Sequence, residues 1–265
     1  MKSFMTFVIN LASQTERKAF MAQQLAAAGV PFEIVTAVDG KALTLEQTAK
    51  VYDEAGARAI QRRPLSRGEI GCALSHVSIY HEVVSRGLPA ALVLEDDARL
   101  NADFGHLIKP LAESIAQAQQ PTVYLLTHLM RYKKPVHGRV DRQHGLHQVV
   151  DACCAHGYLI NQSAAKELVE FFTPIRYPID AWTRIVETGQ IQIFGLNPYI
   201  VGHSEFSKES NLETDRGAID HVFQPAGLKR FGYYLRFYLY EKFFYQIYKL
   251  LAGIKKQHKQ NWDLR

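Results

Sequence analysis

Three consecutive acidic residues, Glu95, Asp96 and Asp97, directly follow a short apolar stretch from Ala90 to Leu94. A continuous apolar run of this length is typical of a buried strand in a parallel sheet. Because an uncompensated buried carboxylate is unfavourable, the acids should emerge where the strand ends, at the edge where open α/β sheets bind ligands. Clustered carboxylates there would hold a hard divalent cation and, through it, substrate phosphates. For the tripeptide alone, a solvated acidic turn is the simpler interpretation, so the rest of the chain decides between the two.

The N-terminal segment predicts a strand, a helix and a second strand. The apolar run that begins at Phe4 turns polar at Asn10, where the first strand should end. Arg17 would lie in the first turn of the following helix, near that strand end, where its guanidinium could meet a phosphate. The second strand should end at Asp39-Gly40, a turn signal. This order predicts an α/β fold with a parallel, doubly wound sheet, although the segment has no glycine-rich dinucleotide fingerprint or Walker loop.

Two Ser-x-x-Glu patterns, Ser13 to Glu16 and Ser66 to Glu69, predict helix starts. The second pattern opens a long apolar helix that contains Ser75 and His76. For such a helix alone, a core histidine bonded to the backbone is the simpler interpretation. The alternative is that both side chains face a ligand.

Two residues late in the chain are further candidates. Asp180 follows a proline-constrained segment and precedes a predicted helix, so it could cap that helix and could also act on a substrate. His203 ends an extended stretch before a polar loop, and it would be a candidate metal ligand if that loop folds back over the acids. Between these elements, the histidine- and glycine-rich stretch 131–147 matches no zinc spacing and predicts a mobile loop or a hairpin.

The composition describes an ordinary globular protein. The chain has 265 residues, of which 47% are hydrophobic and 22% charged, so one sizeable core can form and disorder is not indicated. The three cysteines, Cys72, Cys153 and Cys154, lack the spacing of a disulfide framework or a zinc knuckle, which favours a reducing cytoplasm. The N-terminus lacks the pattern of a signal peptide, and no apolar run reaches the ~18 residues that a membrane span needs.

Residues 229–265 differ from the rest of the chain in charge and composition. The formal net charge is +5, yet residues 229–265 hold nine basic and two acidic residues, which leaves the remaining chain at −2. Basic residues alternate with many aromatic ones there, a pattern typical of a helix that lies in an anionic membrane surface. Packing of the aromatic residues on the domain or on a partner subunit is the alternative. The negative main domain argues against a nucleic-acid partner.

Five segments of the chain, in order, resemble glycosyltransferase family 25, which includes lipooligosaccharide galactosyltransferases and collagen-modifying enzymes. They are Val8–Leu11 with Arg17, Phe32–Gly40, Leu65–His76, Leu92–Asp97 and Pro178–Asp180. Five motifs in family order are much more specific than any one of them. The resemblance extends to the neighbourhood of His203 and does not cover the aromatic tail.

The resemblance implies a GT-A-like, Rossmann-type domain over residues 1–227, followed by a basic, aromatic helical segment over 228–265. It also implies an inverting, metal-dependent β-galactosyltransferase that uses UDP-galactose and acts on a lipooligosaccharide or other glycolipid acceptor. Such an enzyme would work in the cytoplasm, held on the inner face of the cytoplasmic membrane by its C-terminal tail. UDP-glucose or a UDP-N-acetylhexosamine stays open as the donor, because one or two pocket residues decide the sugar.

The resemblance also assigns roles to individual residues. Asp97 would bind Mn²⁺ or Mg²⁺, Glu95 or Asp96 would contact the metal or the donor ribose, and His203 would be the last metal ligand. An inverting reaction needs a base that deprotonates the acceptor hydroxyl, for which Asp180 is the first candidate and Asp96 the second. The residues that would border the nucleotide or the donor are Asn10, Arg17, Asp39, Gly40, Ser75, His76 and Glu95.

A different class of protein is also compatible with the sequence. The chain could be a non-catalytic scaffold at a membrane surface that keeps a degenerate nucleotide-binding fold. Three carboxylates at a strand end have no use in such a scaffold, which favours the enzyme. A metal-dependent phosphoesterase should carry further Asp and His ligands in tight motifs, and the sequence does not contain them.

Overall fold

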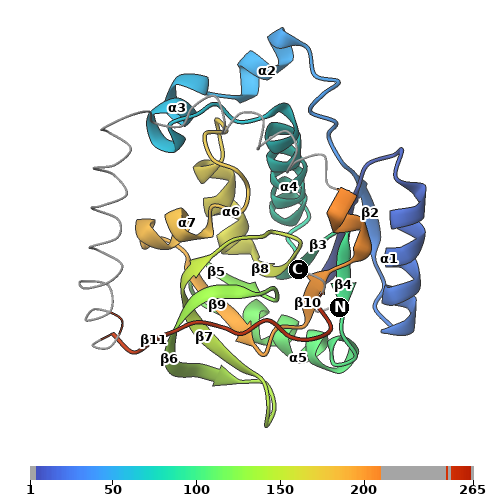
Figure 1. Cartoon of the computed structure of the whole chain (residues 1–265), viewed down its shortest axis with the longest axis vertical. Helices are drawn as coiled ribbons and strands as arrows, with labels where there is room; N and C mark the ends of the chain where they lie inside the picture. The colour runs from blue at the N-terminus through green and yellow to red at the C-terminus, as the bar shows by residue number, and fades with distance from the viewer. Residues whose placement is uncertain (1–3, 210–248, 250–251, 264–265) are drawn as a thin grey trace.

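The structure, a computed structural model of the chain, describes residues 4–209, 249 and 252–263. Within these residues it contains a nine-stranded sheet in the order β11, β6, β7, β9, β5, β8, β3, β1 and β2 (Figure 1). The strands are β1 Met5–Asn10, β2 Glu33–Thr36, β3 Ala90–Glu95, β5 Thr122–Leu125, β6 Leu129–Arg139, β7 Gly145–Ala152, β8 Gly157–Asn161, β9 Gln192–Asn197 and β11 Ile254–Lys255. A separate antiparallel pair joins β4 Ala98–Leu100 to β10 Val201–His203.

The strand pairing is parallel in only part of the sheet. β1 lies between β2 and β3 and is parallel to both, which confirms the predicted strand, helix and strand at the N-terminus. β5 and β9 are also parallel, but β8 is antiparallel to its neighbours β3 and β5. β7, β6 and β11 then extend the sheet with antiparallel pairs. The prediction of a parallel sheet was therefore wrong for this part of the sheet, because it rested on the N-terminal pattern alone. Of these antiparallel pairs, only β6–β7 is a hairpin, which must pair antiparallel, and the others join strands that are distant in the sequence.

Helices cover both faces of the sheet, as a doubly wound α/β fold requires. They are α1 Thr15–Ala27, α2 Leu45–Val51, α3 Glu54–Gln61, α4 Arg67–Ser85, α5 Phe104–Ala116, α6 Gln162–Phe171, α7 Trp182–Thr188 and the 3₁₀ helix η1 Glu205–Glu209. Along β3, Ala91 and Val93 pack with α4, α6 and α7, whereas Leu92 and Leu94 pack with α1 and α5. Both faces of β3 are thus buried, which explains its uninterrupted apolar sequence.

One of the two predicted capping boxes is present. Ser66 accepts a hydrogen bond from the backbone N–H of Glu69 at the start of α4, and the Glu69 carboxylate accepts one from Ser66 N–H. The corresponding pattern before α1 is not a cap. There the N–H of Gln14 donates to the Leu11 carbonyl at 2.8 Å, and this turn delays the helix until Thr15.

The stretch 131–147 lies mostly in the β6–β7 hairpin, one of the two predicted forms. Of the predicted C-terminal helix, residues 228–248, 250 and 251 lie outside the described part of the chain. Residues 252–263, called the C-terminal segment below, contradict the prediction of a helix. They turn at Gly253, form β11, continue without regular structure and turn again at residues 261–262. Ile254 and Gln257 are buried against the domain. No helix in the described part of the chain combines the length and hydropathy that crossing a membrane requires.

Candidate active site

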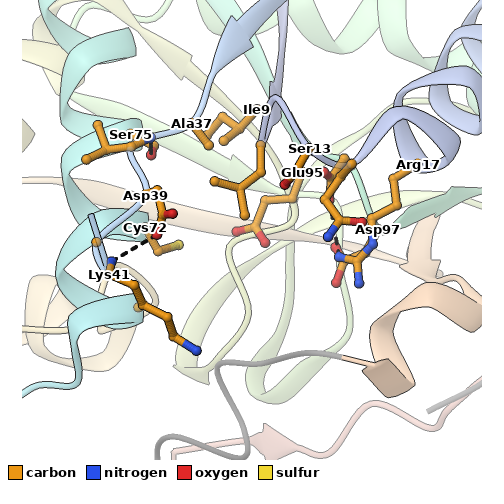
Figure 2. A pocket seen from close by; sticks show the side chains of 16 residues that line it. Ile9, Ser13, Arg17, Ala37, Asp39, Lys41, Cys72, Ser75, Glu95 and Asp97 are labelled. Atoms are coloured by element: carbon orange, nitrogen blue, oxygen red, sulfur yellow. Dashed lines mark hydrogen bonds and ion pairs between the residues drawn. The ribbon is translucent and has the colours of Figure 1, made fainter. Parts of the chain in front are cut away.

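A pocket of about 270 Å³ lies at the carboxyl ends of β1 and β3. Asp39 and Cys72 lie on one side of it and Arg17 and Asp97 on the other, with Glu95 between them (Figure 2). The predicted site residues that line it are Arg17, Asp39, Gly40, Ser75, Glu95, Asp96 and Asp97. The register of the parallel strands, which places Glu95 beside Ile9, brings the two strand ends to the same level. The prediction that the three acids emerge where the strand ends is confirmed, and they line a pocket there.

The loop that carries Asp39 is fixed by a close approach to α4. A Cβ atom on Gly40 would overlap the Arg67 carbonyl, and one on Gly71 would lie 2.6 Å from the Val38 carbonyl oxygen. These two positions therefore require glycine. In addition, Ser75 Oγ accepts a hydrogen bond from the Val38 N–H at 2.8 Å and donates to the Gly71 carbonyl at 2.7 Å. Ser75 thus lines the pocket and holds the wall of the pocket in place.

Asp96 is bound to the elements on the other side of the pocket. Asn10 Nδ2 donates to Asp96 Oδ2 at 2.7 Å, and the Arg17 guanidinium lies 3.5 Å from Asp96 Oδ1. Burial raises the pKa of Asp96, while the contacts with Asn10 and Arg17 act in the opposite direction. Arg17 also donates to the Phe206 carbonyl at 3.0 Å. Asp96 and Asn10 therefore orient Arg17 at the edge of the pocket.

Glu95 is supported from behind by a buried chain of polar groups. Its Oε1 lies 3.2 Å from His76 Nε2, His76 Nδ1 lies 2.7 Å from the Tyr158 hydroxyl, and that hydroxyl lies 2.8 Å from the Tyr80 hydroxyl. Burial opposes the charge of Glu95, but the bond to His76 and the nearby histidines lower its pKa overall. His76 is not among the residues that line the pocket, so it acts on the site through Glu95.

Asp97 has a different environment from its two neighbours. Its Oδ1 is buried and has no hydrogen-bond partner among the described residues. Burial, followed by the charges of Glu95 and Asp96, raises the pKa of Asp97 to about 7. A buried carboxylate oxygen of this kind is unfavourable unless a proton or a cation binds it. The residues present therefore fit a hard divalent cation.

His203 reaches the acids because the chain folds back on itself. β10 pairs with β4, directly after the acids, and places His203 opposite Ala98. The Asp97 carbonyl accepts a hydrogen bond from Ser204 N–H at 2.9 Å. A positive charge on His203 would lower the pKa values of Glu95 and Asp97. The strand pairing thus brings His203 toward the acids, while residues 210–217 of the loop that was expected to fold over them lie outside the described part of the chain.

A sulfur atom and a second imidazole lie beside His203. The potential ligand atoms of Cys154, His156 and His203 lie within 4.8 Å of one another, and the two imidazole rings are 4.1 Å apart. Sulfur and imidazole suit softer cations such as Zn²⁺, whereas Mg²⁺ and Mn²⁺ prefer oxygen. Cys154 and His156 were not predicted as site residues. They directly precede β8, and only the tertiary fold brings that part of the chain to β10.

Asp180 does not line the pocket and does not cap α7, whose N-terminal cap is Ala181. The Asp180 carbonyl instead accepts a hydrogen bond from Trp182 N–H at 2.8 Å. A bond to Cys153, burial, and the charges of Asp180 and Glu95 raise the pKa of the Cys154 thiol. The indole N–H of Trp182, two residues after Asp180, donates to the Cys154 carbonyl at 3.0 Å, so the start of α7 lies beside Cys154.

Cys72 lines the pocket and was not predicted as a site residue. A signal for it was present, because Cys72 precedes Ser75 and His76 by three and four residues and shares their helix face. Its sulfur belongs to a second close group of possible ligands, with His76 and Glu95.

Together, the doubly wound sheet and the pocket at its strand ends define an α/β protein with the Rossmann-like architecture of nucleotide-dependent enzymes. Residues 4–183 match the family model described as "Glycosyltransferase family 25 (LPS biosynthesis protein)". The chain belongs to glycosyltransferase family 25.

Curated relatives include galactosyltransferases and an inactive protein. The chain is 28% identical over 233 residues to procollagen galactosyltransferase 1 of Danio rerio, covering 79% of this chain and 38% of that protein. It is 30% identical over 228 residues to procollagen galactosyltransferase 2 of Homo sapiens, covering 79% and 36%. It is 26% identical over 232 residues to "Inactive glycosyltransferase 25 family member 3" of Mus musculus, covering 79% and 38%. The matched region thus spans little more than a third of each relative.

Proposed function

We propose that this chain is an inverting glycosyltransferase of GT-A-like fold that moves galactose from UDP-galactose to an acceptor sugar of a lipooligosaccharide or another glycolipid. The observation that carries the proposal is the pocket in which Glu95, Asp96 and Asp97 face Arg17, in a member of this family. The names of the procollagen galactosyltransferases favour galactose as the transferred sugar. The family description, which refers to LPS biosynthesis, favours a glycolipid acceptor.

The two walls of the pocket suit the two halves of a nucleotide-sugar. Arg17 is held by Asp96 and by the Phe206 carbonyl, so its guanidinium is oriented before the donor binds and can meet the diphosphate. On the opposite wall, Asp39 and Gly40 would border the nucleoside. Asn10 and Ser75 support these walls through their bonds to Asp96 and to Val38.

Asp97, Glu95 and His203 would hold the divalent cation, Mn²⁺ or Mg²⁺. The buried Oδ1 of Asp97 supports this assignment, since a cation would replace the hydrogen bond that the atom lacks among the described residues. When bound, the cation would neutralise charge on the departing diphosphate. His76 would keep Glu95 ionised and oriented through the 3.2 Å contact between them.

Asp180 stays the first candidate for the base that deprotonates the acceptor hydroxyl. It directly precedes α7, whose Trp182 donates to the Cys154 carbonyl, so an acceptor bound beside Cys154 would be within reach of this segment. Asp96, the second candidate, has a pKa raised by burial, but both of its oxygens already contact Asn10 and Arg17, so it is less available to an acceptor hydroxyl.

A glycolipid acceptor and the basic residues of 229–265 favour an enzyme that acts at the cytoplasmic face of a membrane. Anionic lipid headgroups would attract these basic residues. Vesicle sedimentation tests this part of the proposal. The chain should bind vesicles that contain phosphatidylglycerol at low salt and be released by salt. Equal affinity for neutral vesicles would contradict the electrostatic attachment.

Transfer to a lipooligosaccharide-derived oligosaccharide tests the proposed reaction. The chain should be incubated with UDP-galactose, UDP-glucose, UDP-N-acetylglucosamine or UDP-N-acetylgalactosamine, in Mn²⁺ or in EDTA, and the product analysed by NMR. We expect galactose transfer in Mn²⁺, with a β-anomeric product. An α-anomeric product would contradict inversion, and preferred transfer of another sugar would replace the donor.

The second candidate function is a non-catalytic scaffold at a membrane surface. Relatives named inactive, at 26 to 28% identity, are the observation that favours it. The scaffold gives no reason for Asp97 Oδ1 to be buried without a hydrogen bond, whereas a metal-dependent transferase does. A folded chain that neither binds nor hydrolyses any UDP-sugar would favour the scaffold.

A further inference from the structure

The C-terminal segment, residues 252–263, crosses the edge of the sheet and ends beside the candidate site. It begins as β11, which pairs with β6 and is drawn in red in Figure 1. Gln257 then holds it to two strands of the sheet, β6 and β9. Its side chain accepts a hydrogen bond from Leu129 N–H at 2.6 Å and donates to the Leu196 carbonyl at 3.0 Å and to Asn197 Oδ1 at 2.9 Å. These contacts fix the path of the segment toward β10.

The end of the segment packs directly on β10, the strand that carries His203. A Cβ atom on Gly202 would lie 2.5 Å from the Trp262 ring and 3.1 Å from the Asp263 carboxyl carbon. The end of the segment and β10 therefore touch at a position that requires glycine. Trp262 also lies 5.4 Å from the Tyr199 ring, between centroids. The contact is therefore specific to this part of β10 and its approach.

Asp263 is the residue of the segment that faces His203. Its side chain is only 1% exposed, and its Oδ1 accepts a hydrogen bond from His203 N–H at 3.1 Å. The same oxygen lies 3.6 Å from His203 Nδ1, a distance of an ion pair rather than a hydrogen bond. Asp263 Oδ2 accepts from the Tyr199 hydroxyl at 2.9 Å, which fixes the plane of the carboxylate.

We propose that Asp263 is a positioning residue that orients His203 as a metal ligand, so that the C-terminal segment completes the metal site of the catalytic domain. This inference rests on the proposed function of His203. A buried carboxylate beside Nδ1 favours the imidazole form that carries its proton on that nitrogen, leaving the lone pair of Nε2 for a cation. Carboxylates in this position are common partners of ligating histidines, and their loss weakens metal binding about 10- to 100-fold.

Asp263 contacts His203 at two places, its backbone N–H and the neighbourhood of its ring nitrogen Nδ1. Because Tyr199 fixes the carboxylate from the other side, Asp263 can hold the imidazole in one orientation. A role through His203 predicts that the two residues depend on each other, whereas a purely structural role predicts independent effects.

A double-mutant cycle tests this dependence without relying on turnover. Mn²⁺ affinity would be measured in the presence of UDP by the EPR signal of free Mn²⁺, for the wild type, Asp263→Asn, His203→Ala and the double variant. Asp263→Asn keeps the shape of the side chain and an oxygen that can accept from Tyr199. We expect Asp263→Asn to weaken Mn²⁺ binding about 10- to 100-fold in the wild type and less than about two-fold in the His203→Ala background.

Gln260→Ala is the matched control on the same segment. Gln260 donates to the Tyr199 carbonyl at 2.8 Å and accepts from Trp262 Nε1 at 2.7 Å, and its hydrogen bonds within the described residues do not include His203. Gln260→Ala should lower the melting temperature while leaving Mn²⁺ affinity within about two-fold of the wild type. A second readout uses ¹⁵N shifts of the His203 ring in the metal-free protein, where Asp263→Asn should reduce the population protonated at Nδ1.

The variants distinguish a failure of the positioning role of Asp263 from a failure of the proposed role of His203 as a metal ligand. If His203→Ala leaves Mn²⁺ affinity unchanged, His203 is not a ligand, and both the metal assignment and the positioning role are overturned. If His203→Ala weakens binding but Asp263→Asn does not, only the positioning role is overturned. Equal losses from Asp263→Asn in both backgrounds would also overturn it, because the residue would then act on the fold alone.

Discussion

The strand-end pocket and the β6–β7 hairpin each place an aspartate near a histidine, with opposite consequences for its proton. In the hairpin, Asp141 Oδ1 accepts hydrogen bonds from Gln143 N–H at 2.7 Å and His144 N–H at 2.6 Å, and these bonds lower its pKa to about 2. In the pocket, burial and two neighbouring acids raise the pKa of Asp97 to about 7.

The comparison indicates that the Asp141 carboxylate stabilises the fold, whereas the Asp97 carboxylate belongs to the candidate site. Asp141 is supplied with donors by its own turn, so its charge stabilises the hairpin. The buried Oδ1 of Asp97 has no donor among the described residues, so its charge opposes folding until a cation binds.

The largest expected effect is the loss of transfer in Asp97→Asn. An amide keeps the size of the side chain and removes the charge that would hold the cation, so Mn²⁺-dependent transfer should fall about 1000-fold or more. The measurement is UDP release with the acceptor present, at saturating Mn²⁺. Glu113→Gln, on the exposed face of α5, is the control and should retain wild-type turnover. Unchanged turnover of Asp97→Asn would remove Asp97 from the metal site.

Asp180→Asn should lower the rate of transfer about 100-fold or more and leave donor binding unchanged, because a base acts on the acceptor after the donor has bound. Single-turnover transfer and calorimetric UDP-sugar binding measure the two effects separately. Asp96→Asn should instead weaken donor binding, since it loosens Arg17. A wild-type transfer rate in Asp180→Asn would exclude this residue as the base.

The metal-free stability of Asp97→Asn should exceed that of the wild type at pH 8. The folded pKa of about 7 lies above the unfolded value of 3.8, so folding takes up a proton and wild-type stability declines as pH rises from about 4 to 7. The advantage of the amide should therefore be small at pH 4 and reach on the order of a few kcal/mol above pH 7. Chemical denaturation in EDTA at both pH values checks this, and a destabilised variant at pH 8 would contradict the burial argument.

The smallest expected effect is in the hairpin. Asp141→Asn should lower the melting temperature slightly at pH 7, because the amide is a weaker acceptor for the turn N–H groups. The folded pKa of about 2 lies below the unfolded value, so the contribution of Asp141 is complete above about pH 4 and is lost as pH falls toward 2. Melting curves from pH 2 to pH 7 should show the two proteins converging at low pH. A constant difference would mean that charge has no part in it.

The oxygen-rich side of the site could be predicted from sequence because it depends on local patterns. The apolar run before Glu95 fixed a buried strand, and the parallel start of the sheet brought Asn10, Arg17 and Asp39 to the same edge. These residues precede or follow strand ends, where the geometry of an α/β sheet leaves few choices.

The histidine side could not be predicted to the same extent, because it depends on pairings between distant segments. Only the β4–β10 pair brings His203 to the acids, and only the path of the C-terminal segment brings Asp263 to His203. The antiparallel part of the sheet and the non-helical structure of residues 252–263 escaped prediction for the same reason. Their strands are fixed by tertiary packing, such as the burial of Ile254, rather than by local propensity.

Calorimetric titration with UDP-galactose directly tests whether the strand-end acids form a metal-dependent donor site. It would be performed in Mn²⁺ and in EDTA, on the wild type and on Asp97→Asn, with folding checked by circular dichroism. We predict that the wild type binds UDP-galactose in Mn²⁺ at least about ten-fold more tightly than in EDTA, and that Asp97→Asn loses this difference. Equal binding by the wild type with and without Mn²⁺, or no binding by the folded protein, would contradict the account.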